Sequence, residues 1–336
     1  MLSLGSFCGF LWYHKTMNSN VSKLKLYIVA FAFTFSIGFS FFGIKKCIPY
    51  GDTLTILSYR YVAALLGVIV WIGICKAMKI YPETPPGRPK GKLYQTAIFY
   101  ILFMILQIFA MYFATSVEGA IVYAMVPIFA KVIGRIVLGE RSTRLQMFFM
   151  VMTVSALVLL IILNAASLDL NATGLIIMIF SCFFMACQNV SARYIRGVFA
   201  PVEITKTIAV LGAIVFIGAS LVRAAYRGSI GWLLEPLYHL DFVFWAGFLG
   251  VFCILLSAQF MAYMLAHMEI IQSSIFNSAS TLVSIIAGIL ILGEPLYWYH
   301  YVCGAIIFCG VIGMILAPAD ANNAGKSLSD DIRKKK

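Results

Sequence analysis

The sequence predicts an all-α integral membrane protein whose ten transmembrane helices form two inverted five-helix repeats. Of its 336 residues, 62% are hydrophobic and only 11% are charged, whereas soluble domains carry about 25% charged residues. Apolar runs long enough to cross a bilayer recur along the whole chain. One membrane hairpin also occurs twice, because the segment that ends in Leu138-Gly139-Glu140 returns as one that ends in Leu292-Gly293-Glu294.

A membrane helix needs about 20 mostly apolar residues, and the chain contains ten apolar runs of about this length. The connections between the third and fourth runs, and between the eighth and ninth, are very short, so each of those pairs must be an antiparallel hairpin. Residues 1–25 are expected to form a cytoplasmic segment, 26–163 the first repeat, 172–316 the second repeat, and 317–336 a disordered cytoplasmic tail. The expected spans are 26–44, 54–75, 93–114, 118–138, 145–163, 172–192, 203–222, 241–265, 269–292 and 297–316.

Lysines and arginines collect on one side of the predicted membrane. Most of them lie in the loop at 76–92, in the connections at 141–144 and 193–196, and at the two ends of the chain. Cytoplasmic loops of membrane proteins are enriched in these residues, so both termini are predicted to face the cytoplasm from a multi-pass protein of the cytoplasmic (inner) membrane. The net charge of +12 follows from this topology, and no nucleic-acid partner is expected.

The duplication extends beyond the Leu-Gly-Glu ends. Gln107 and Gln259 occupy matched positions in the third and eighth spans, and Gly134 and Gly288 do so in the fourth and ninth. Because five spans per repeat is an odd number, the two repeats enter the bilayer with opposite orientation. Inverted repeats are the architecture of many secondary transporters, whose substrates bind near the middle of the membrane.

With these features the chain resembles the drug/metabolite transporter superfamily, and specifically its EamA-type members. The features that carry the resemblance are two five-span halves, the Leu-Gly-Glu end on the fourth span of each half, and Pro127 inside the first copy. The second copy departs at Thr281, which replaces the proline, and at Pro295, which replaces Arg141. The resemblance implies alternating access, with export as the expected direction. It does not name a substrate, because members carry amino acids, nucleotides and their sugars, carboxylates and drugs.

The fourth span carries the most distinctive candidate site residues. Tyr123, Pro127, Lys131 and Arg135 recur every four residues, so they follow one slowly drifting face of a helix. A charge within the bilayer costs at least about 2.5 kcal/mol, so Lys131 is expected to face a cavity or a partner. The alternative is that both cations stretch to the cytoplasmic interface.

Arg60 is a further cation within a predicted span. Its alternatives to a site role are an outward stretch to the interface or an ion pair with Glu118. The acidic residues lie at span ends, so cations without central carboxylates favour an anionic or zwitterionic substrate whose acidic group supplies the missing charge.

Uncharged polar side chains complete the predicted substrate path. In the ninth span Asn277 replaces Tyr123 and Thr281 replaces Pro127. The other uncharged candidates are Gln107, Gln188, Asn189 and Gln259. For all six residues the alternative to a substrate contact is an interhelical hydrogen bond or tight helix packing.

The sequence gives no sign of catalytic or metal chemistry. The eight cysteines form no Cys-x-x-Cys pair, and the four histidines are scattered, so no cofactor, metal or catalytic residue is predicted and the protein is not expected to be an enzyme. The expected partners are a small-molecule substrate and the lipid bilayer, with a homodimer left open. The rival interpretations are a non-transporting receptor or assembly protein and an intramembrane enzyme.

Overall fold

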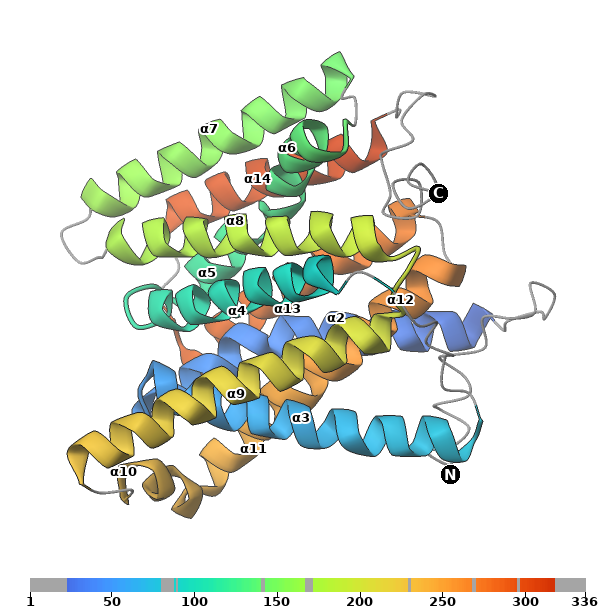
Figure 1. Cartoon of the computed structure of the whole chain (residues 1–336). Helices are drawn as coiled ribbons and strands as arrows, with labels where there is room; N and C mark the ends of the chain where they lie inside the picture. Colours follow the sequence, from blue (N-terminus) through green and yellow to red (C-terminus); the bar gives the residue numbers. More distant parts are fainter. Residues whose placement is uncertain are drawn as a thin grey trace. The chain divides into compact units, whose positions relative to one another are not determined.

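The computed structural model describes residues 23–79, 88, 90–139, 143–166, 172–228, 231–267, 270–294 and 297–317, and the predicted terminal segments lie almost wholly outside these ranges. All regular structure in the described ranges is helical (Figure 1). Eight helices are long and apolar enough to cross a membrane, and the shorter apolar helices Arg144–Leu160 and Phe276–Leu292 bring the described set to the ten that were predicted. The predicted fold class is confirmed.

The helices group into two compact units, which do not follow the two sequence repeats. Unit 1 comprises Met1–Lys90 and Ala200–Phe276, and unit 2 comprises Gly91–Phe199 and Asn277–Lys336. Each unit therefore contains helices from both repeats.

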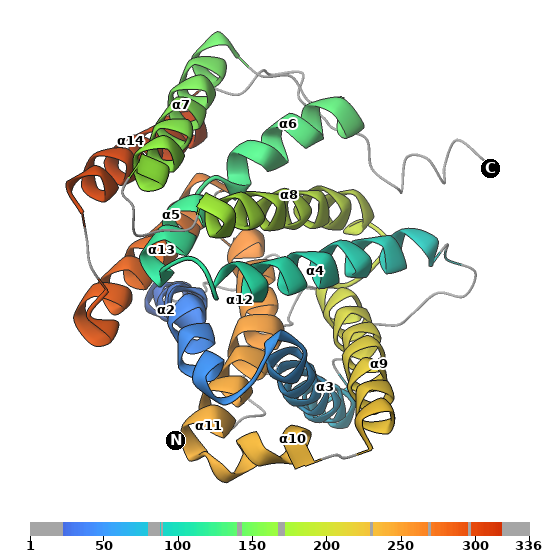
Figure 2. The ribbon, with the colours of Figure 1, turned by 90° about the vertical axis from the view of Figure 1, so that its left-hand side faces the viewer.

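Unit 1 is built around α3, which packs against α9 and α11, while α2 packs against α11 and α12. Figure 2 shows α3 and α9 lying next to each other. The contact is close because Gly212 on α9 has no side chain: a Cβ there would lie 2.0 Å from the Tyr61 ring of α3. The described elements of this unit are α2 (Lys23–Cys47), η1 (Ile48–Tyr50), α3 (Thr53–Ala77), α9 (Pro201–Arg227), α10 (Gly231–Leu234), η2 (Glu235–Tyr238), α11 (Leu240–Gly250), η3 (Val251–Leu256), α12 (Ser257–His267) and the first residues of α13 (Ile270–Leu292).

Unit 2 contains two prominent helix pairs, α4 with α8 and α7 with α14, which Figures 1 and 2 both show side by side. Small residues bring α7 and α14 together, because a Cβ at Gly310 would lie 2.0 Å from the Thr153 hydroxyl oxygen and one at Gly313 would lie 2.4 Å from the Phe149 ring. The described elements are α4 (Gly91–Ala110), α5 (Ser116–Tyr123), α6 (Val126–Leu138), α7 (Arg144–Ala166), α8 (Ala172–Ile195), the remainder of α13 and α14 (Trp298–Leu316).

Two predicted spans are not continuous α-helices. The fourth is divided into α5 and α6 by a turn at residues 124–125, and Pro127 occupies the first turn of α6, where the missing N–H of a proline is tolerated. The eighth contains a π-helical segment, η3, between α11 and α12. A proline, Pro127, accompanies the first interruption, but the sequence contains no comparable signal for the second.

The repeated Leu-Gly-Glu segment ends a helix in the same way in both copies. Gly139 after α6 and Gly293 after α13 have φ angles of 72° and 65°. This left-handed conformation suits glycine and commonly terminates helices. After α13 the chain folds back, and the N–H of Glu294 donates to the carbonyl of Gly288 at 3.2 Å. In the second copy Gly293 therefore turns Glu294 out of α13, toward the start of α5.

Candidate functional site

Arg60 is the most deeply buried cation among the described residues. It lies near the start of α3, and its side chain is 1% exposed. Its Nε and Nη1 atoms have no hydrogen-bond partner within the part of the chain that the structure describes. The exposed fraction shows that the predicted alternative of an outward stretch to water is wrong. The other alternative, an ion pair with Glu118, would join residues of two different units and stays a prediction.

The surroundings of Arg60 come from three elements of unit 1. Its guanidinium lies in the vicinity of Cys47 at the end of α2 and of Cys253 in η3. The backbones also approach closely, because a Cβ at Gly250 would lie 2.4 Å from the Arg60 carbonyl oxygen. The Cys253 thiol in turn donates to the carbonyl of Ser36 on α2 at 2.9 Å. Arg60 thus lies beside the π-helical segment, where an irregular backbone often accompanies a functional site.

The described carboxylates of unit 1 are not placed to neutralise Arg60. Glu203 accepts two hydrogen bonds from Arg88, at 2.8 and 3.1 Å. Asp52 is held by another arginine, as described next, and Glu235 and Asp241 are exposed. No carboxylate of this unit is described as a partner of the buried guanidinium.

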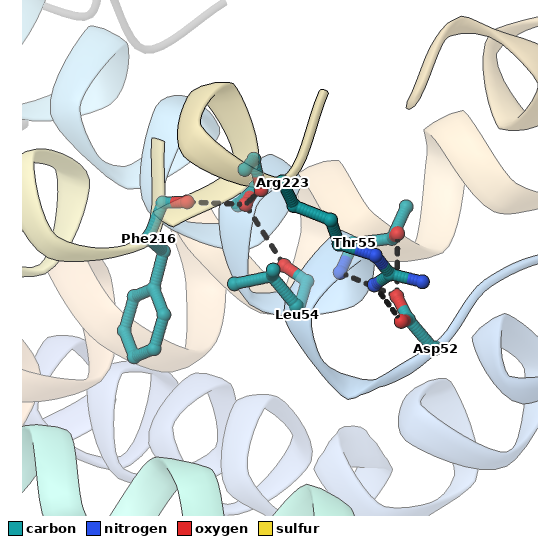
Figure 3. Close-up of polar contacts among 7 residues, drawn as sticks. Asp52, Leu54, Thr55, Phe216 and Arg223 are labelled. Atoms are coloured by element: carbon teal, nitrogen blue, oxygen red, sulfur yellow. Dashed lines mark hydrogen bonds and ion pairs between the residues drawn. The ribbon is translucent and has the colours of Figure 1, made fainter. Parts of the chain in front are cut away.

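The Asp52 carboxylate lies at the N-terminus of α3, outside the membrane spans (Figure 3). It accepts hydrogen bonds from the backbone N–H and hydroxyl of Thr55, at 3.0 and 2.6 Å, and it forms an ion pair with Arg223. Burial by itself would raise the pKa of the Asp52 carboxyl, but the bonds from Thr55 and Arg223 outweigh it and lower the pKa below its ordinary value. This cluster therefore fixes the start of α3.

A second polar contact ties α3 to α9 within the membrane. The Ser58 hydroxyl lies 2.7 Å from the Ser220 hydroxyl, and it is within hydrogen-bond distance of the carbonyls of Leu54 and Phe216, two of the residues labelled in Figure 3. These bonds hold the helix that carries Arg60 in one position.

Gln259, the other predicted site residue in unit 1, has an interhelical role. It is 3% exposed, and its Nε2 donates to the Thr205 hydroxyl of α9 at 3.4 Å. This contact is the interhelical hydrogen bond that was the alternative to a substrate contact.

In unit 2 the four residues of the predicted stripe occupy different environments. Tyr123 and Pro127 flank the interruption between α5 and α6, and Tyr123 packs against the Phe103 ring with centroids 6.1 Å apart. Lys131 is partly exposed, and the exposed Arg135 donates to the Met147 sulfur at 3.4 Å. The stripe therefore runs from a packed aromatic to an exposed cation.

The remaining uncharged candidates of unit 2 are buried or half-buried. Gln107 is 3% exposed, and its Oε1 has no hydrogen-bond partner among the described residues. Gln188 on α8 is buried, and the adjacent Asn189 is half-buried. On α13, Thr281 is buried and Asn277 is half-buried, with the Asn277 carbonyl accepting from the Ser280 hydroxyl. No contact in unit 2 joins these side chains into a single described cluster.

Sequence reasoning missed a polar cluster at the N-termini of α5 and α14. The Glu294 carboxylate accepts from the Ser116 and Val117 backbone N–H groups and from the Ser116 hydroxyl, at 2.9, 3.1 and 2.6 Å. Nearby, His300 Nε2 lies 3.6 Å from Glu118 Oε1, and each side chain is 2% exposed. Thr115-x-x-Glu118 is a capping-box pattern, so the helix start was readable from the sequence. The approach of His300 was not.

Chemically, the two units offer a buried guanidinium and a buried carboxylate–imidazole pair. Within the described residues, no group of three or more histidine, cysteine, aspartate or glutamate side chains is placed to hold a metal ion. A guanidinium can donate charge-assisted hydrogen bonds to an anionic group.

The comparisons with known proteins agree with this architecture. The model of the EamA-like transporter family matches residues 24–162 and 172–316. The chain is 30% identical over 293 residues to "Uncharacterized transporter YcxC" of Bacillus subtilis (strain 168), which covers 85% of this chain and 91% of that protein. A solved structure, a crystal structure of a protein with 11% sequence identity, superposes with a TM-score of 0.58 over 87% of this chain and 96% of its own, which supports the fold. The chain belongs to the EamA-like transporter family and is a multi-pass membrane transporter.

Proposed function

We propose that this transporter exports a small polar metabolite with an acidic group, either anionic or zwitterionic, across the cytoplasmic membrane by alternating access. The observation that carries the proposal is the buried Arg60, whose Nε and Nη1 atoms have no hydrogen-bond partner among the described residues. The direction of transport and the cytoplasmic position of both termini rest on the family resemblance and on the distribution of lysines and arginines.

The burial of Arg60 carries an energetic cost. Removing one partner from a buried ion pair costs about 3–5 kcal/mol, because the remaining charge is uncompensated. An arginine cannot avoid this cost by losing its proton, because the guanidinium stays protonated in proteins. A carboxylate or phosphate oxygen that reached Nε and Nη1 would supply both charge and hydrogen bonds. An acidic substrate is therefore the partner that best compensates the guanidinium.

Lys131 is a predicted site residue of unit 2. It lies on α6 beyond the interruption next to Pro127, and it is partly exposed. Because an exposed cation is well solvated, it binds an anion less strongly than a buried one. We therefore assign the binding of the acidic group to Arg60.

The proposal is tested by a thermal-shift screen of the purified protein. The solutes are amino acids, dicarboxylates, nucleotides and sugar phosphates, each with a neutral analogue such as the corresponding amide. An acidic solute at about 100 times its dissociation constant stabilises the folded protein by about 2.7 kcal/mol. We expect stabilisation by the acid and none by its amide.

Three variants connect the screen to the structure. Arg60→Gln should lose the stabilisation. Arg60→Lys should keep part of it, because lysine retains the charge but not the planar fork of donors. Arg196→Gln is the matched control, since Arg196 is an exposed arginine that is not among the predicted site residues. Equal stabilisation by acids and amides, or an unchanged shift in Arg60→Gln, would contradict the proposal.

A further inference from the structure

A short segment of unit 1, residues 231–239, connects α9 to α11 at the end of the unit where α3 begins. It contains α10 and η2, and Figure 2 shows α10 between the ends of α9 and α11. We call it the outer strap, because in the predicted topology this end of the helices faces the outside. Every residue of the strap is described, and among them only Pro236 is buried, whereas Tyr238 is 85% exposed. The strap therefore has almost no core of its own, and its position depends on contacts with its neighbours.

One arginine joins the strap to two helices. Arg223, near the end of α9, forms the ion pair with Asp52 at the start of α3 that Figure 3 shows. The same guanidinium lies over the Trp232 ring of the strap, 4.3 Å from the ring centroid. A cation over the face of an indole is attracted to it. Arg223 thus holds α9, α3 and the strap together.

Aromatic side chains hold the strap at two further points. The Tyr59 hydroxyl of α3 donates to the Leu233 carbonyl at 2.5 Å. At the end of the strap the His239 ring packs against the Tyr50 ring of η1, with centroids 4.6 Å apart. Phe242, which follows the strap on α11 and is 0% exposed, packs against both tyrosine rings at 6.4 and 5.3 Å. These contacts close the unit at the end where α3 begins.

The two tyrosines that hold the strap are neighbours of the Arg60 surroundings along the chain. Tyr59 directly precedes Arg60 on α3, and Tyr50 follows Cys47 by one turn of η1. Cys47 lies in the vicinity of Arg60, and the two side chains are 0% and 1% exposed. The strap and its tyrosines therefore lie between the outer end of the unit and the buried guanidinium.

The contacts of the strap are weak enough to be reversible. The side chains of Arg223 and Asp52 are 27% and 44% exposed, and an ion pair that is screened by water contributes little to stability. The contact with the Trp232 ring and the hydrogen bond from Tyr59 are single interactions of the same modest order. A segment held by a few such contacts opens at a much lower free-energy cost than the whole fold.

We propose that the outer strap is the outer gate of unit 1. Its release from Arg223, Tyr59 and Tyr50 exposes the surroundings of Arg60, and its return closes them. The role of this gate in transport rests on the proposed function, in which the acidic group of the substrate binds Arg60 and leaves toward the outside. The opening itself is a property of the strap and its contacts, whatever the substrate is.

The test measures how often the strap opens, through the reactivity of Cys47. Purified full-length protein in detergent is treated with iodoacetamide, a small neutral thiol reagent, and the alkylated fraction of Cys47 is followed over time by peptide mass spectrometry. Because Cys47 is 0% exposed, it reacts while the strap is open, and its rate follows the open fraction. No solute is present, so failure of the gate leaves the acidic-substrate proposal standing, and the reverse also holds.

Two variants release the strap through different contacts. Arg223→Gln removes the ion pair and the contact with Trp232, and it should raise the rate of Cys47 alkylation roughly tenfold. Tyr59→Phe removes only the hydrogen bond to Leu233 and should raise the rate about fivefold. This conservative second variant keeps the test decisive if Arg223→Gln does not fold.

Each variant has a matched control. Arg88→Gln removes an arginine–carboxylate pair with Glu203 at the opposite end of α9. Tyr226→Phe changes a tyrosine on α9 that is 94% exposed. Both controls should leave Cys47 reacting at the wild-type rate. Cys182, which is 0% exposed in unit 2, reports any general loosening and should stay unreactive throughout.

The proposal is supported if both variants accelerate the alkylation of Cys47 and leave Cys182 unchanged. Alkylation of Cys47 at the wild-type rate in folded Arg223→Gln or Tyr59→Phe protein would overturn it. A parallel rise at Cys182 would do the same, because the variants would then loosen the whole fold instead of opening the strap.

Discussion

Glu294 provides a direct test of why the Leu-Gly-Glu segment occurs. Its carboxylate accepts three hydrogen bonds from the first residues of α5, two from backbone N–H groups and one from the Ser116 hydroxyl. The first N–H groups of a helix have no partner within the helix. A carboxylate at this position satisfies two of them and also interacts favourably with the helix dipole. Glu294→Ala removes all of these contacts at once.

The magnitude follows from the number of bonds and the exposure of the site. Hydrogen bonds to a charged group contribute about 1.5–3 kcal/mol each, and loss of an N-terminal cap costs about 0.5–2 kcal/mol. Because Glu294 is half-buried, water can replace part of what the substitution removes. We expect Glu294→Ala to lower the free energy of unfolding by about 2–4 kcal/mol. Glu294→Gln should lose roughly half as much, because one oxygen acceptor remains.

Gly288→Ala perturbs the same contact without touching the glutamate. The added Cβ would lie 2.7 Å from Ser116 Oγ and 2.9 Å from Glu294 Oε2, so the hydrogen-bonded groups must move apart. Overpacking of this kind costs about 1–3 kcal/mol. In the double variant with Glu294→Ala the two losses should sum to less than their separate values, because residues that share one contact are not independent.

The assay is the free energy of unfolding in detergent, measured by denaturant titration with helix content as the readout. Gly304→Ala is the matched control, since its nearest contact is an ordinary 3.7 Å to Ile121 in the same unit. We expect little change for that variant. A Glu294→Ala protein as stable as the wild type, or fully additive losses in the double variant, would refute the role assigned to the carboxylate.

Two further predictions concern unit 1. Gly212→Ala should destabilise the protein by at least about 1–3 kcal/mol, because the new Cβ would overlap the Tyr61 ring. Gly218→Ala on the same helix is the control, since its Cβ would enter open space and the variant should be neutral or stabilising. Equal changes in the thermal unfolding of the two variants would contradict this packing. Asp52→Asn should lower stability at neutral pH, because the wild-type carboxyl has a lowered pKa and its pairing with Arg223 favours the folded state above the ordinary pKa. That contribution is lost as the pH falls below about 4, so the unfolding temperatures of the two proteins should converge in acid, and a constant difference would count against the ion pair.

Much of the fold was predictable because it depends on local properties. The length of the apolar runs predicted the spans to within a few residues, since a membrane helix must satisfy its backbone internally over the bilayer thickness. The glycine of each Leu-Gly-Glu segment likewise predicted a helix end, and both glycines have positive φ. The interruption of the fourth span was not predicted, although it lies beside Pro127, a residue type that commonly breaks helices. These features need only neighbouring residues to form.

The grouping of helices could not be predicted in the same way. The repeats divide the sequence into halves, but α3 packs with α9 and α7 packs with α14, so each pair joins helices from both repeats. The period of apolar residues gives little guidance inside a membrane, where most faces of every helix are apolar. Contacts such as that of Gly212 with Tyr61 depend on long-range packing instead.

In the candidate site, too, single residues could be predicted from the sequence, whereas their long-range contacts could not. The sequence identified Arg60 as an intramembrane cation, but its burial beside η3 depends on a π-helical segment for which no sequence signal was found. His300 was passed over because it stands among aromatic residues that are typical of a membrane interface. Its position opposite Glu118 results from the packing of two helix starts that are far apart in the sequence. Lone charged residues are visible in a sequence, whereas their partners are not.

The most direct test of the central claim is the uptake of a matched acid and amide by liposomes that contain the purified protein. The acid is the solute that stabilises the protein most in the thermal-shift screen, and the amide is its uncharged analogue. Loss of a charge-assisted contact of about 1.5–3 kcal/mol corresponds to roughly a tenfold to 150-fold change in rate or affinity. We predict that the wild-type protein transports the acid at least about tenfold faster than the amide, and that Arg60→Gln removes this preference. Equal transport of both solutes, or a preference that Arg60→Gln leaves intact, would contradict the account.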